Sequence, residues 1–250
     1  MSDHITTELH GAVQVIRMNR PDKKNALTAQ MYGQMSDGLI SAFENDAVGA
    51  VLILGCPGVF SAGNDIGDFM KIAMSGDRSS MQVFDFLEQI IMAKKPVIAG
   101  VDGLAIGIGT TMLLHCDHVI ASEQATFKTP FVDLGLVPEA GSSLFAPRLM
   151  GHHRAFELLA MGEKFSPQAA QDAGFVNAIV TPDKLEQTAL DVAADIASKP
   201  PQAMEVTRKL IRGDRSDILA RMKEEAVLFG ERLASDEAKQ AFMAFMSKGK

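Results

Sequence analysis

The chain has 250 residues, of which 47% are hydrophobic and 22% are charged, and this composition is typical of a folded globular protein. Its formal net charge of −7 argues against a general nucleic-acid binder, because contacts to phosphate groups need a basic surface. Two cysteines without a CxxC pattern favour a reducing compartment, and no apolar run in the sequence has the length of a membrane span. We therefore expect a cytoplasmic protein with neither a nucleic acid nor a membrane as partner.

Strand and helix patterns alternate through about the first two hundred residues. Residues 12–19 alternate in polarity like a strand, and residues 50–55 and 96–103 are short apolar runs that are typical of buried strands. Helical patterns lie between these strands, at residues 29–44 and 81–93. The alternation predicts an α/β core with crossover connections.

The end of the chain has helical patterns only. Three of them follow one another, at residues 202–212, 216–233 and 235–247. Ser216 and Ser235 are the expected N-caps of the last two helices. We therefore divide the chain into a catalytic core, residues 1–199, and a helical oligomerisation region, residues 200–250.

The last helical pattern has an apolar face with little chain left to cover it. This face carries Phe242, Met243, Phe245 and Met246. Two interpretations stay open at this point. Part of the face packs on another subunit, or the helix folds back on the core of its own chain.

Two segments of small residues each follow a strand pattern. They are FSAGNDI at 60–66 and GLAIGIGTT at 103–111. Small residues leave backbone N–H groups accessible to a ligand, and the first turn of a helix favours negative charge. The second segment partly resembles a dinucleotide-binding turn, but Met112 stands where that motif needs a small residue. We interpret both segments as places for a transient oxyanion, although a tight surface turn is the alternative for the first.

Glu139 is a carboxylate in an otherwise apolar stretch, residues 130–143, and is a candidate base. An apolar environment would raise the pKa of its carboxyl group and strengthen it as a base once ionised. The residues expected to supply that environment are Phe127, Phe131, Leu134, Leu136 and Val137. In the alternative interpretation, Glu139 lies in the first turn of a helix and complements the helix dipole. Asp133 is a second candidate acid.

The run His115, Cys116, Asp117 and His118 does not predict a metal site. Consecutive residues cannot all converge on one ion, and no second cluster has ligand spacing. We expect Asp117 to be a buried structural acid and both histidines to have no special role.

Four motifs together resemble the crotonase superfamily, which is also called the enoyl-CoA hydratase/isomerase family. They are RPDKKNAL at 20–27, FSAGNDI at 60–66, the segment 95–122, and AFMSK at 244–248. The resemblance implies a crotonase-like spiral of ββα units with a C-terminal helical trimerisation region, assembled as a homotrimer or a dimer of trimers. It also implies an acyl-CoA substrate, so that coenzyme A is part of the substrate and no separate cofactor is needed.

The resemblance also implies roles for individual residues. The backbone N–H groups of Ala62 and Ile108 would form an oxyanion hole for the thioester oxygen. The residues that it places near the substrate are Lys24, Ala26, Leu27, Ala62, Gly63, Asn64, Asp65, Ile66, Phe131, Phe245 and Lys248.

Hydratases of this family place two glutamates where this chain has Thr111 and Phe131, so hydration by such a pair is not expected. Glu139, in PEAGSS, instead matches the single glutamate of the monofunctional Δ3,Δ2-enoyl-CoA isomerases. The sequence therefore predicts an isomerase that moves a proton from C2 to C4 through a dienolate. The alternative is a hydratase, or another acyl-CoA lyase or hydrolase, that uses a different acid such as Asp133. A catalytically silent acyl-CoA binder is a third possibility.

Overall fold

The computed structural model describes residues 4–68 and 81–248, and their strands form two sheets. The larger sheet has the order β1 (Ile5–His10), β2 (Val13–Met18), β3 (Ala50–Leu54), β5 (Val97–Val101), β7 (His118–Ser122) and β9 (Ala178–Val180). The smaller sheet has the order β4 (Val59–Ser61), β6 (Leu104–Ile106) and β8 (Thr126–Lys128). All neighbouring strands are parallel except β1 and β2, which pair antiparallel.

The chain moves between the two sheets in a repeated ββα pattern. In each of three successive turns, one strand joins the larger sheet and the next joins the smaller sheet, as β3–β4, β5–β6 and β7–β8 do. The helices α3 (Met81–Ile91), α4 (Ile108–Thr111) and α5 (Ser142–Met150) follow these strand pairs in turn. This is the spiral of ββα units that the sequence predicts.

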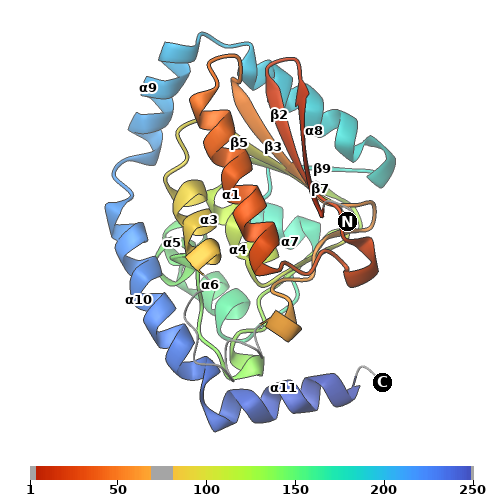
Figure 1. The fold of residues 1–250 in the computed structure, drawn as a ribbon, viewed down its shortest axis with the longest axis vertical. Helices are drawn as coiled ribbons and strands as arrows, with labels where there is room; N and C mark the ends of the chain where they lie inside the picture. The colour runs from red at the N-terminus through yellow and green to blue at the C-terminus, as the bar shows by residue number, and fades with distance from the viewer. Residues whose placement is uncertain (1–3, 69–80, 249–250) are drawn as a thin grey trace.

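The central strands are apolar throughout because helices cover both faces of the larger sheet. Every residue of β3 and β5 is buried. On one face, Leu185, Ala189 and Ala193 of α8 (Pro182–Ala197) pack against the strands. On the other face lie α1 (Ala29–Glu44) and α3, and Figure 1 shows the sheet between α1 and α8.

Shorter elements complete the chain. The 3-10 helices are η1 (Pro21–Lys23), η2 (Met112–His115) and η3 (Val132–Leu134), and the remaining helices of the core are α6 (His152–Leu159) and α7 (Pro167–Asp172). The sequence did not predict β1, which is mostly exposed and lacks a clear apolar alternation. β1 forms because it pairs with β2, and its own composition does not predict a strand.

Three helices follow the core, as predicted. They are α9 (Pro201–Arg212), α10 (Ser216–Leu233) and α11 (Asp236–Lys248), and in Figure 1 they run down one side of the molecule and along its lower end. Ser235 caps α11, since its Oγ accepts a hydrogen bond of 3.2 Å from the N–H of Ala238. The prediction for Ser216 is wrong: Arg215 is the N-cap of α10, and the Ser216 N–H donates to Asp214 at 2.8 Å.

The apolar face of α11 is partly used within its own chain. Phe242 is only 5% exposed and packs in the main core, whereas Met243 is 57% exposed. The side chains of Phe245 and Met246 lie outside the described residues. Two apolar side chains on α9 are more exposed than Met243: Leu210 is 79% exposed and Ile211 is 80% exposed. Within the described part of the chain, no helix combines the length and the apolar character that a membrane crossing requires.

Candidate active site

Three segments that the sequence singled out meet at one edge of the smaller sheet. Residues 62–66 follow β4, residues 107–111 follow β6, and residues 129–141 follow β8. These strands are parallel neighbours, so their carboxyl ends lie at the same edge, where open α/β sheets usually bind ligands. The first two turns touch: a Cβ at Gly63 would lie 2.9 Å from the carbonyl oxygen of Ile106. Only glycine allows the backbones to come so close.

The RPDKKNAL segment runs beside the first of these turns. The N–H of Leu27 donates to the Gly63 carbonyl at 2.8 Å, and the N–H of Asp65 donates to the Leu27 carbonyl at 2.9 Å. Arg20 adds an ion pair of 2.7 Å to Asp65, which holds the pKa of this carboxyl group below its usual value against the effect of partial burial. The structure thus brings together the predicted substrate residues Lys24, Ala26, Leu27, Ala62, Gly63, Asn64, Asp65 and Ile66.

The prediction that Ala62 supplies a free N–H is wrong. Its N–H donates to the carbonyl oxygen of Lys24 at 2.9 Å, and the N–H of Gly63 donates to Ser61 Oγ at 3.1 Å. Among residues 62–65, all of which the structure describes, Asn64 alone has an N–H without a hydrogen-bond partner. Asn64 is therefore the residue of this turn whose backbone can meet a ligand.

The second turn leaves the predicted N–H of Ile108 available. Gly107 has a φ of +56° and a ψ of −120°, and its own N–H donates to the Lys128 carbonyl at 2.8 Å. Ile108 and Gly109 then begin α4, and within the described residues their N–H groups have no hydrogen-bond partner. The open N–H groups and the helix dipole both favour an anionic oxygen at this position.

Glu139 lies next to these turns and is only 8% exposed. The hydroxyl group of Thr111, the last residue of α4, donates to its Oε1 at 2.5 Å. Burial raises the pKa of Glu139 to about 8; the Thr111 hydrogen bond opposes this shift, and the nearby charge of Glu225 adds to it. The carboxyl group is thus a base whose pKa lies near neutral pH.

The alternative role of Glu139 in a first helical turn is wrong. α5 begins three residues later, at Ser142, and the Glu139 carbonyl accepts hydrogen bonds from the Ser142 N–H and Oγ. Of the five apolar residues expected around it, Phe127, Phe131 and Leu136 are each at most 5% exposed, whereas Leu134 and Val137 are only partly buried. The Glu139 side chain therefore does not cap a helix.

Asp133, the second candidate acid, is in a different setting. Its side chain is 54% exposed and forms an ion pair of 3.2 Å with Lys128. The other two positions considered, Thr111 and Phe131, carry no carboxylate. Glu139 is therefore the buried carboxylate of this set. Asp117 is structural as expected, with ion pairs to Arg208 at 2.8 Å and Arg212 at 3.2 Å, but its side chain is 23% exposed and so is not fully buried.

Two further buried groups hold the loop that carries Glu139, and the sequence analysis did not predict this role for either. Glu225 of α10 accepts hydrogen bonds from the N–H of Gly141 at 2.6 Å and of Ser143 at 2.9 Å. His115 of η2 lies with Nε2 2.7 Å from the carbonyl oxygen of Ala140. Burial lowers the pKa of His115 to about 3, so its imidazole is neutral and Nε2 carries the proton.

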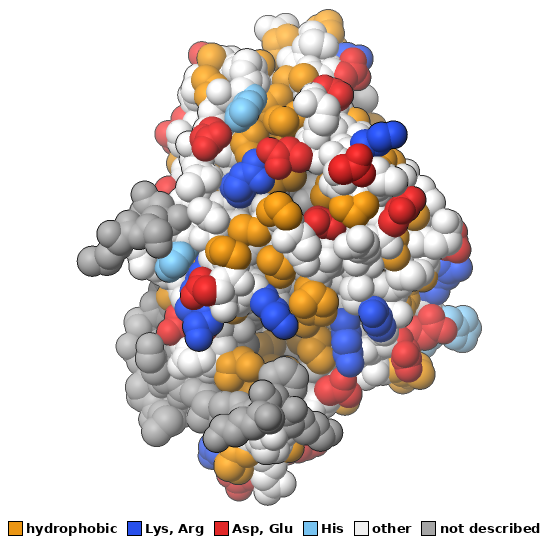
Figure 2. Space-filling view, turned by 90° about the vertical axis from the view of Figure 1, so that its right-hand side faces the viewer, with side chains coloured by type: hydrophobic (Ala, Val, Ile, Leu, Met, Phe, Trp, Pro, Cys, Tyr) orange, Lys and Arg blue, Asp and Glu red, His pale blue; other side chains and the backbone are white. Residues whose placement is uncertain are grey.

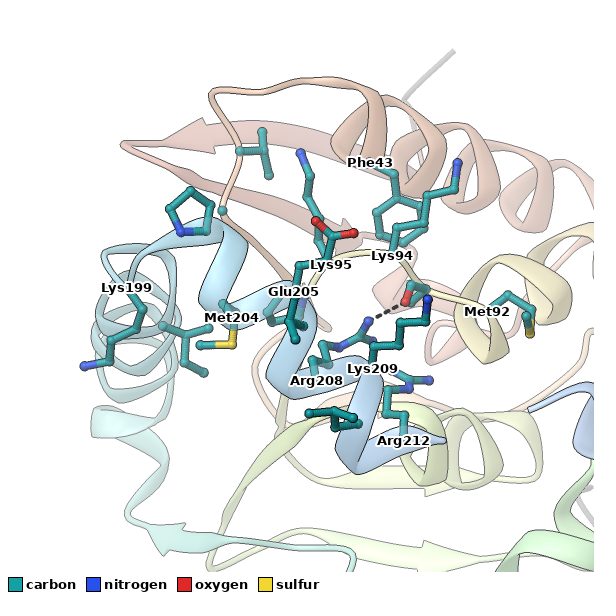
Figure 3. A pocket seen from close by; sticks show the side chains of 18 of the residues that line it. Phe43, Met92, Lys94, Lys95, Lys199, Met204, Glu205, Arg208, Lys209 and Arg212 are labelled. Carbon is teal, nitrogen blue, oxygen red and sulfur yellow. Dashed lines mark hydrogen bonds between the residues drawn. The ribbon is translucent and has the colours of Figure 1, made fainter. Parts of the chain in front are cut away.

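Two of the predicted substrate residues cannot be placed relative to this site. Phe245 and Lys248 belong to α11, but the placement of their side chains is outside the described residues. A separate groove of about 1330 Å³ lies beside α9, and Figure 3 shows Arg208, Lys209 and other side chains that line it. Neither Glu139 nor the two turns contribute to this groove.

Comparison with known proteins identifies relatives over almost the whole chain. The chain is 34% identical to a probable enoyl-CoA hydratase of Rhizobium meliloti over 98% of its length and 96% of that protein. It is also 34% identical to enoyl-CoA delta isomerase 2 of Rattus norvegicus, over 98% of this chain but only 63% of the longer rat protein.

Solved structures agree with this relationship. Pseudomonas aeruginosa OdaA is 40% identical, with a TM-score of 0.93 over 98% of this chain and 99% of that one. An enoyl-CoA hydratase/isomerase from Pseudoalteromonas atlantica T6c is 37% identical, with the same TM-score, over 98% of both chains. The model of the family described as enoyl-CoA hydratase/isomerase matches residues 8–250. The chain thus belongs to the enoyl-CoA hydratase/isomerase family, the crotonase superfamily, and has its fold.

Proposed function

We propose that the protein is an enoyl-CoA isomerase that moves the double bond of a 3-enoyl-CoA to the 2-position, with Glu139 as the proton shuttle. The observation that carries this proposal is the buried carboxylate of Glu139, whose one side-chain hydrogen-bond partner among the described residues is the hydroxyl group of Thr111. An isomerase needs one base that serves two carbon atoms. A hydratase must also hold and activate a water molecule, and Thr111 and Phe131 supply no second carboxylate for that task.

In the first step, ionised Glu139 removes a proton from C2 of the substrate. The electrons of the broken C–H bond pass into a dienolate whose negative charge lies on the thioester oxygen. The carboxyl group then returns the proton to C4, and the double bond forms between C2 and C3. A pKa of about 8 suits both steps, because the group is basic enough to take the proton and acidic enough to return it. The apolar walls limit access of water to the intermediate.

The N–H groups of Asn64 and Ile108 are the proposed donors to the thioester oxygen. They follow neighbouring parallel strands and come from turns in contact, which supports placing them at one oxygen atom. Oxyanion donors of this kind typically contribute about 10²–10³ in rate each. The proposal keeps Ile108 from the sequence analysis and replaces Ala62 with Asn64.

The coenzyme A part of the substrate is proposed to lie along residues 24–27 and 62–66. Hydrogen bonds join these segments into one surface, and Lys24 at its edge is exposed. Figure 2 shows several Lys and Arg side chains on one face of the molecule, interspersed with Asp, Glu and apolar side chains, although the chain as a whole is acidic. Local cations of this kind suit a ligand with phosphate groups.

A direct test compares the wild type and Glu139→Gln on a trans-3-enoyl-CoA. The absorbance of the conjugated 2-enoyl product reports isomerisation, and its hydration is followed separately. We expect the variant to lose roughly 10²–10⁴ in kcat, the usual contribution of a general base. Asp133→Asn is the matched control, because this exposed carboxylate should be dispensable.

Hydration is the second candidate reaction, since one relative is described as a probable hydratase. Wild-type hydration without isomerisation would favour it, as would loss of activity in Asp133→Asn with Glu139→Gln unaffected. Binding of acyl-CoA without turnover of either kind would instead indicate a silent binder. Any of these results would overturn the isomerase proposal.

We also propose a homotrimer, or a dimer of trimers, in the cytoplasm. Val206, Leu210 and Ile211 on α9 are 58%, 79% and 80% exposed, which is unusual for apolar residues and suits a subunit contact. The thiols of Cys56 and Cys116 are unpaired, which suits a reducing compartment. Light scattering of the purified protein tests the assembly, and a monomeric mass would contradict it.

A further inference from the structure

We infer that helix α10 positions the catalytic base. Glu225 is the principal positioning residue, and the pair Arg215–His115 supports the same loop through a second set of contacts. This inference rests on the proposed role of Glu139. Neither Glu225 nor His115 is expected to touch the substrate. Both act on the short backbone segment that follows Glu139.

Glu225 holds the side of the loop that enters α5. Its two oxygens accept from different N–H groups, Oε2 from Gly141 at 2.6 Å and Oε1 from Ser143 at 2.9 Å. Ser143 lies in the first turn of α5, and without Glu225 its N–H would have no hydrogen-bond partner among the described residues. A carboxylate that is only 4% exposed thus fixes the backbone two to four residues after Glu139.

His115 holds the carbonyl group that lies between Glu139 and the Glu225 contacts. Its Nε2 donates to the Ala140 carbonyl at 2.7 Å, and its Nδ1 faces Arg215 Nη1 at 3.3 Å. Arg215 is the N-cap of α10, and its guanidinium lies over the Phe145 ring, 4.8 Å from the centroid. The same ring stacks on His115. One helix therefore contacts the loop through two separate routes.

The backbone at Ala140 shows why such support is needed. Ala140 is fully buried and has a φ of +64°, in the left-handed region that residues other than glycine rarely adopt. That conformation is unfavourable for an L-residue and persists only where the surroundings impose it. The Ala140 carbonyl that binds His115 and the Gly141 N–H that binds Glu225 belong to one peptide group, the one that directly follows the strained residue. They hold the turn that directs the Glu139 side chain toward Thr111.

Charge adds a second effect. The charged or titratable groups around the base are Tyr32 from α1, His115 from η2, and Arg215, Arg221 and Glu225 from α10. Tyr32 and His115 are neutral at ordinary pH, because burial raises the pKa of Tyr32 and lowers that of His115. Glu225 is therefore the negative group that opposes ionisation of Glu139. Its removal should make Glu139 a weaker base.

The first experiment measures Glu225→Gln in full pH profiles of kcat and KM, with Glu231→Gln as control. Glu231 lies exposed on the same helix, so its substitution removes the same charge without touching the loop. A glutamine can accept only one of the two N–H groups and presents its own N–H to the other. We expect kcat to fall roughly 10- to 100-fold, the usual cost of a misplaced reacting group, with little change in KM. The acidic limb of kcat/KM should move to lower pH.

A second pair of variants covers the case in which Glu225→Gln fails to fold. His115→Gln keeps an amide N–H near the position of Nε2, whereas His115→Leu removes the donor. We expect His115→Leu to lose kcat and His115→Gln to retain most of it. Equal kcat in both variants and the wild type would overturn the role of His115.

A second reaction separates this inference from the isomerase proposal. Exchange of the C2 protons of a saturated acyl-CoA with D2O needs only the base and the oxyanion hole, so it reports on Glu139 whatever the physiological reaction is. Exchange without isomerisation would defeat the isomerase proposal and leave the positioning role testable. If Glu225→Gln has the same exchange rate, kcat and pH profile as the wild type, the positioning role is wrong. A lower melting temperature with an unchanged profile in the folded fraction would do the same.

Discussion

The two halves of the proposed active site are built from different parts of the polypeptide. The oxyanion turns use main-chain N–H groups of Asn64 and Ile108, and glycines at positions 63 and 107 have positive φ angles there. The proposed base is a side chain, Glu139, which accepts a hydrogen bond from Thr111, and the backbone after it donates to Glu225 and accepts from His115. Backbone geometry defines one half, and side-chain contacts define the other.

This difference determines how each half can be changed. Substitution of a side chain cannot delete a backbone N–H, so the oxyanion turns respond only to changes that move the backbone. The base can be removed, retuned or displaced by a single substitution. A family with this arrangement can keep its oxyanion hole while its catalytic carboxylates differ, as the positions Thr111 and Phe131 illustrate.

The largest effect on the backbone half is expected from Gly107→Ala. A Cβ at this position would meet no other atom within 4 Å, so the substitution adds backbone strain without a clash. Relief of that strain would turn the Ile108 N–H away, and we expect kcat to fall roughly 10²–10³-fold, as for the loss of one oxyanion donor. Gly151→Ala is the matched control, because Gly151 also precedes a helix with positive φ and open space. Equal activity of both variants would contradict a main-chain oxyanion hole at Ile108.

The second prediction concerns the stability cost of the base. The pKa of Glu139 is raised from 4.5 to about 8 on folding, so between these values the folded protein holds a proton that the unfolded chain has lost. The free energy of unfolding should therefore fall as pH rises through this range, by roughly 3–5 kcal/mol in all. Glu139→Gln lacks this dependence. Denaturant titrations of both proteins between about pH 4 and pH 9 measure the difference, and parallel curves would show that the pKa is not raised.

A smaller effect is expected from Thr111→Val, which removes the one hydroxyl group that donates to Glu139. That hydrogen bond favours the ionised carboxylate, so its loss should raise the pKa of Glu139 further and move the acidic limb of kcat/KM to higher pH. At neutral pH we expect kcat/KM to fall roughly tenfold. Thr110→Val is the control, since the Thr110 hydroxyl donates to the Ala105 carbonyl and not to the base. The same pH profile in both variants would exclude a specific role of Thr111.

The features that the sequence predicted correctly are those with local causes. Helix α1 has the predicted bounds because its apolar spacing and its N-cap, Thr28, lie within the segment itself. The small residues that predicted the FSAGNDI and GIGTT turns also lie within those segments, although the short strands β4 and β6, which the turns directly follow, were not predicted. Glu139 stood out because a carboxylate in a largely apolar stretch is visible without any knowledge of the fold, but the same reasoning also singled out Asp133.

The features that the sequence missed depend on contacts between distant parts of the chain. Ala62 and Asn64 lie in the same loop of small residues, so the sequence alone does not distinguish their N–H groups. Only the hydrogen bond from the Ala62 N–H to the carbonyl group of Lys24, 38 residues earlier, shows which N–H is free. Glu225 lies in a helix with several similar acids, and its contact to Gly141 spans 84 residues. His115 was judged unimportant because its partner, the carbonyl group of Ala140, has no sequence signature.

The contact between Glu225 and Gly141 also has a consequence for the order in which parts of the proposed active site can form during synthesis. Residues 60–66 and 103–111 and the strands that carry them leave the ribosome long before α10 does, and N-terminal segments generally fold first. A nascent chain that ends before Glu225 can therefore form both glycine turns but has no carboxylate to fix the loop after Glu139. Such a chain would resemble the finished protein in its sheets and lack a correctly aimed base. Proton transfer would begin only when translation reaches the final helices.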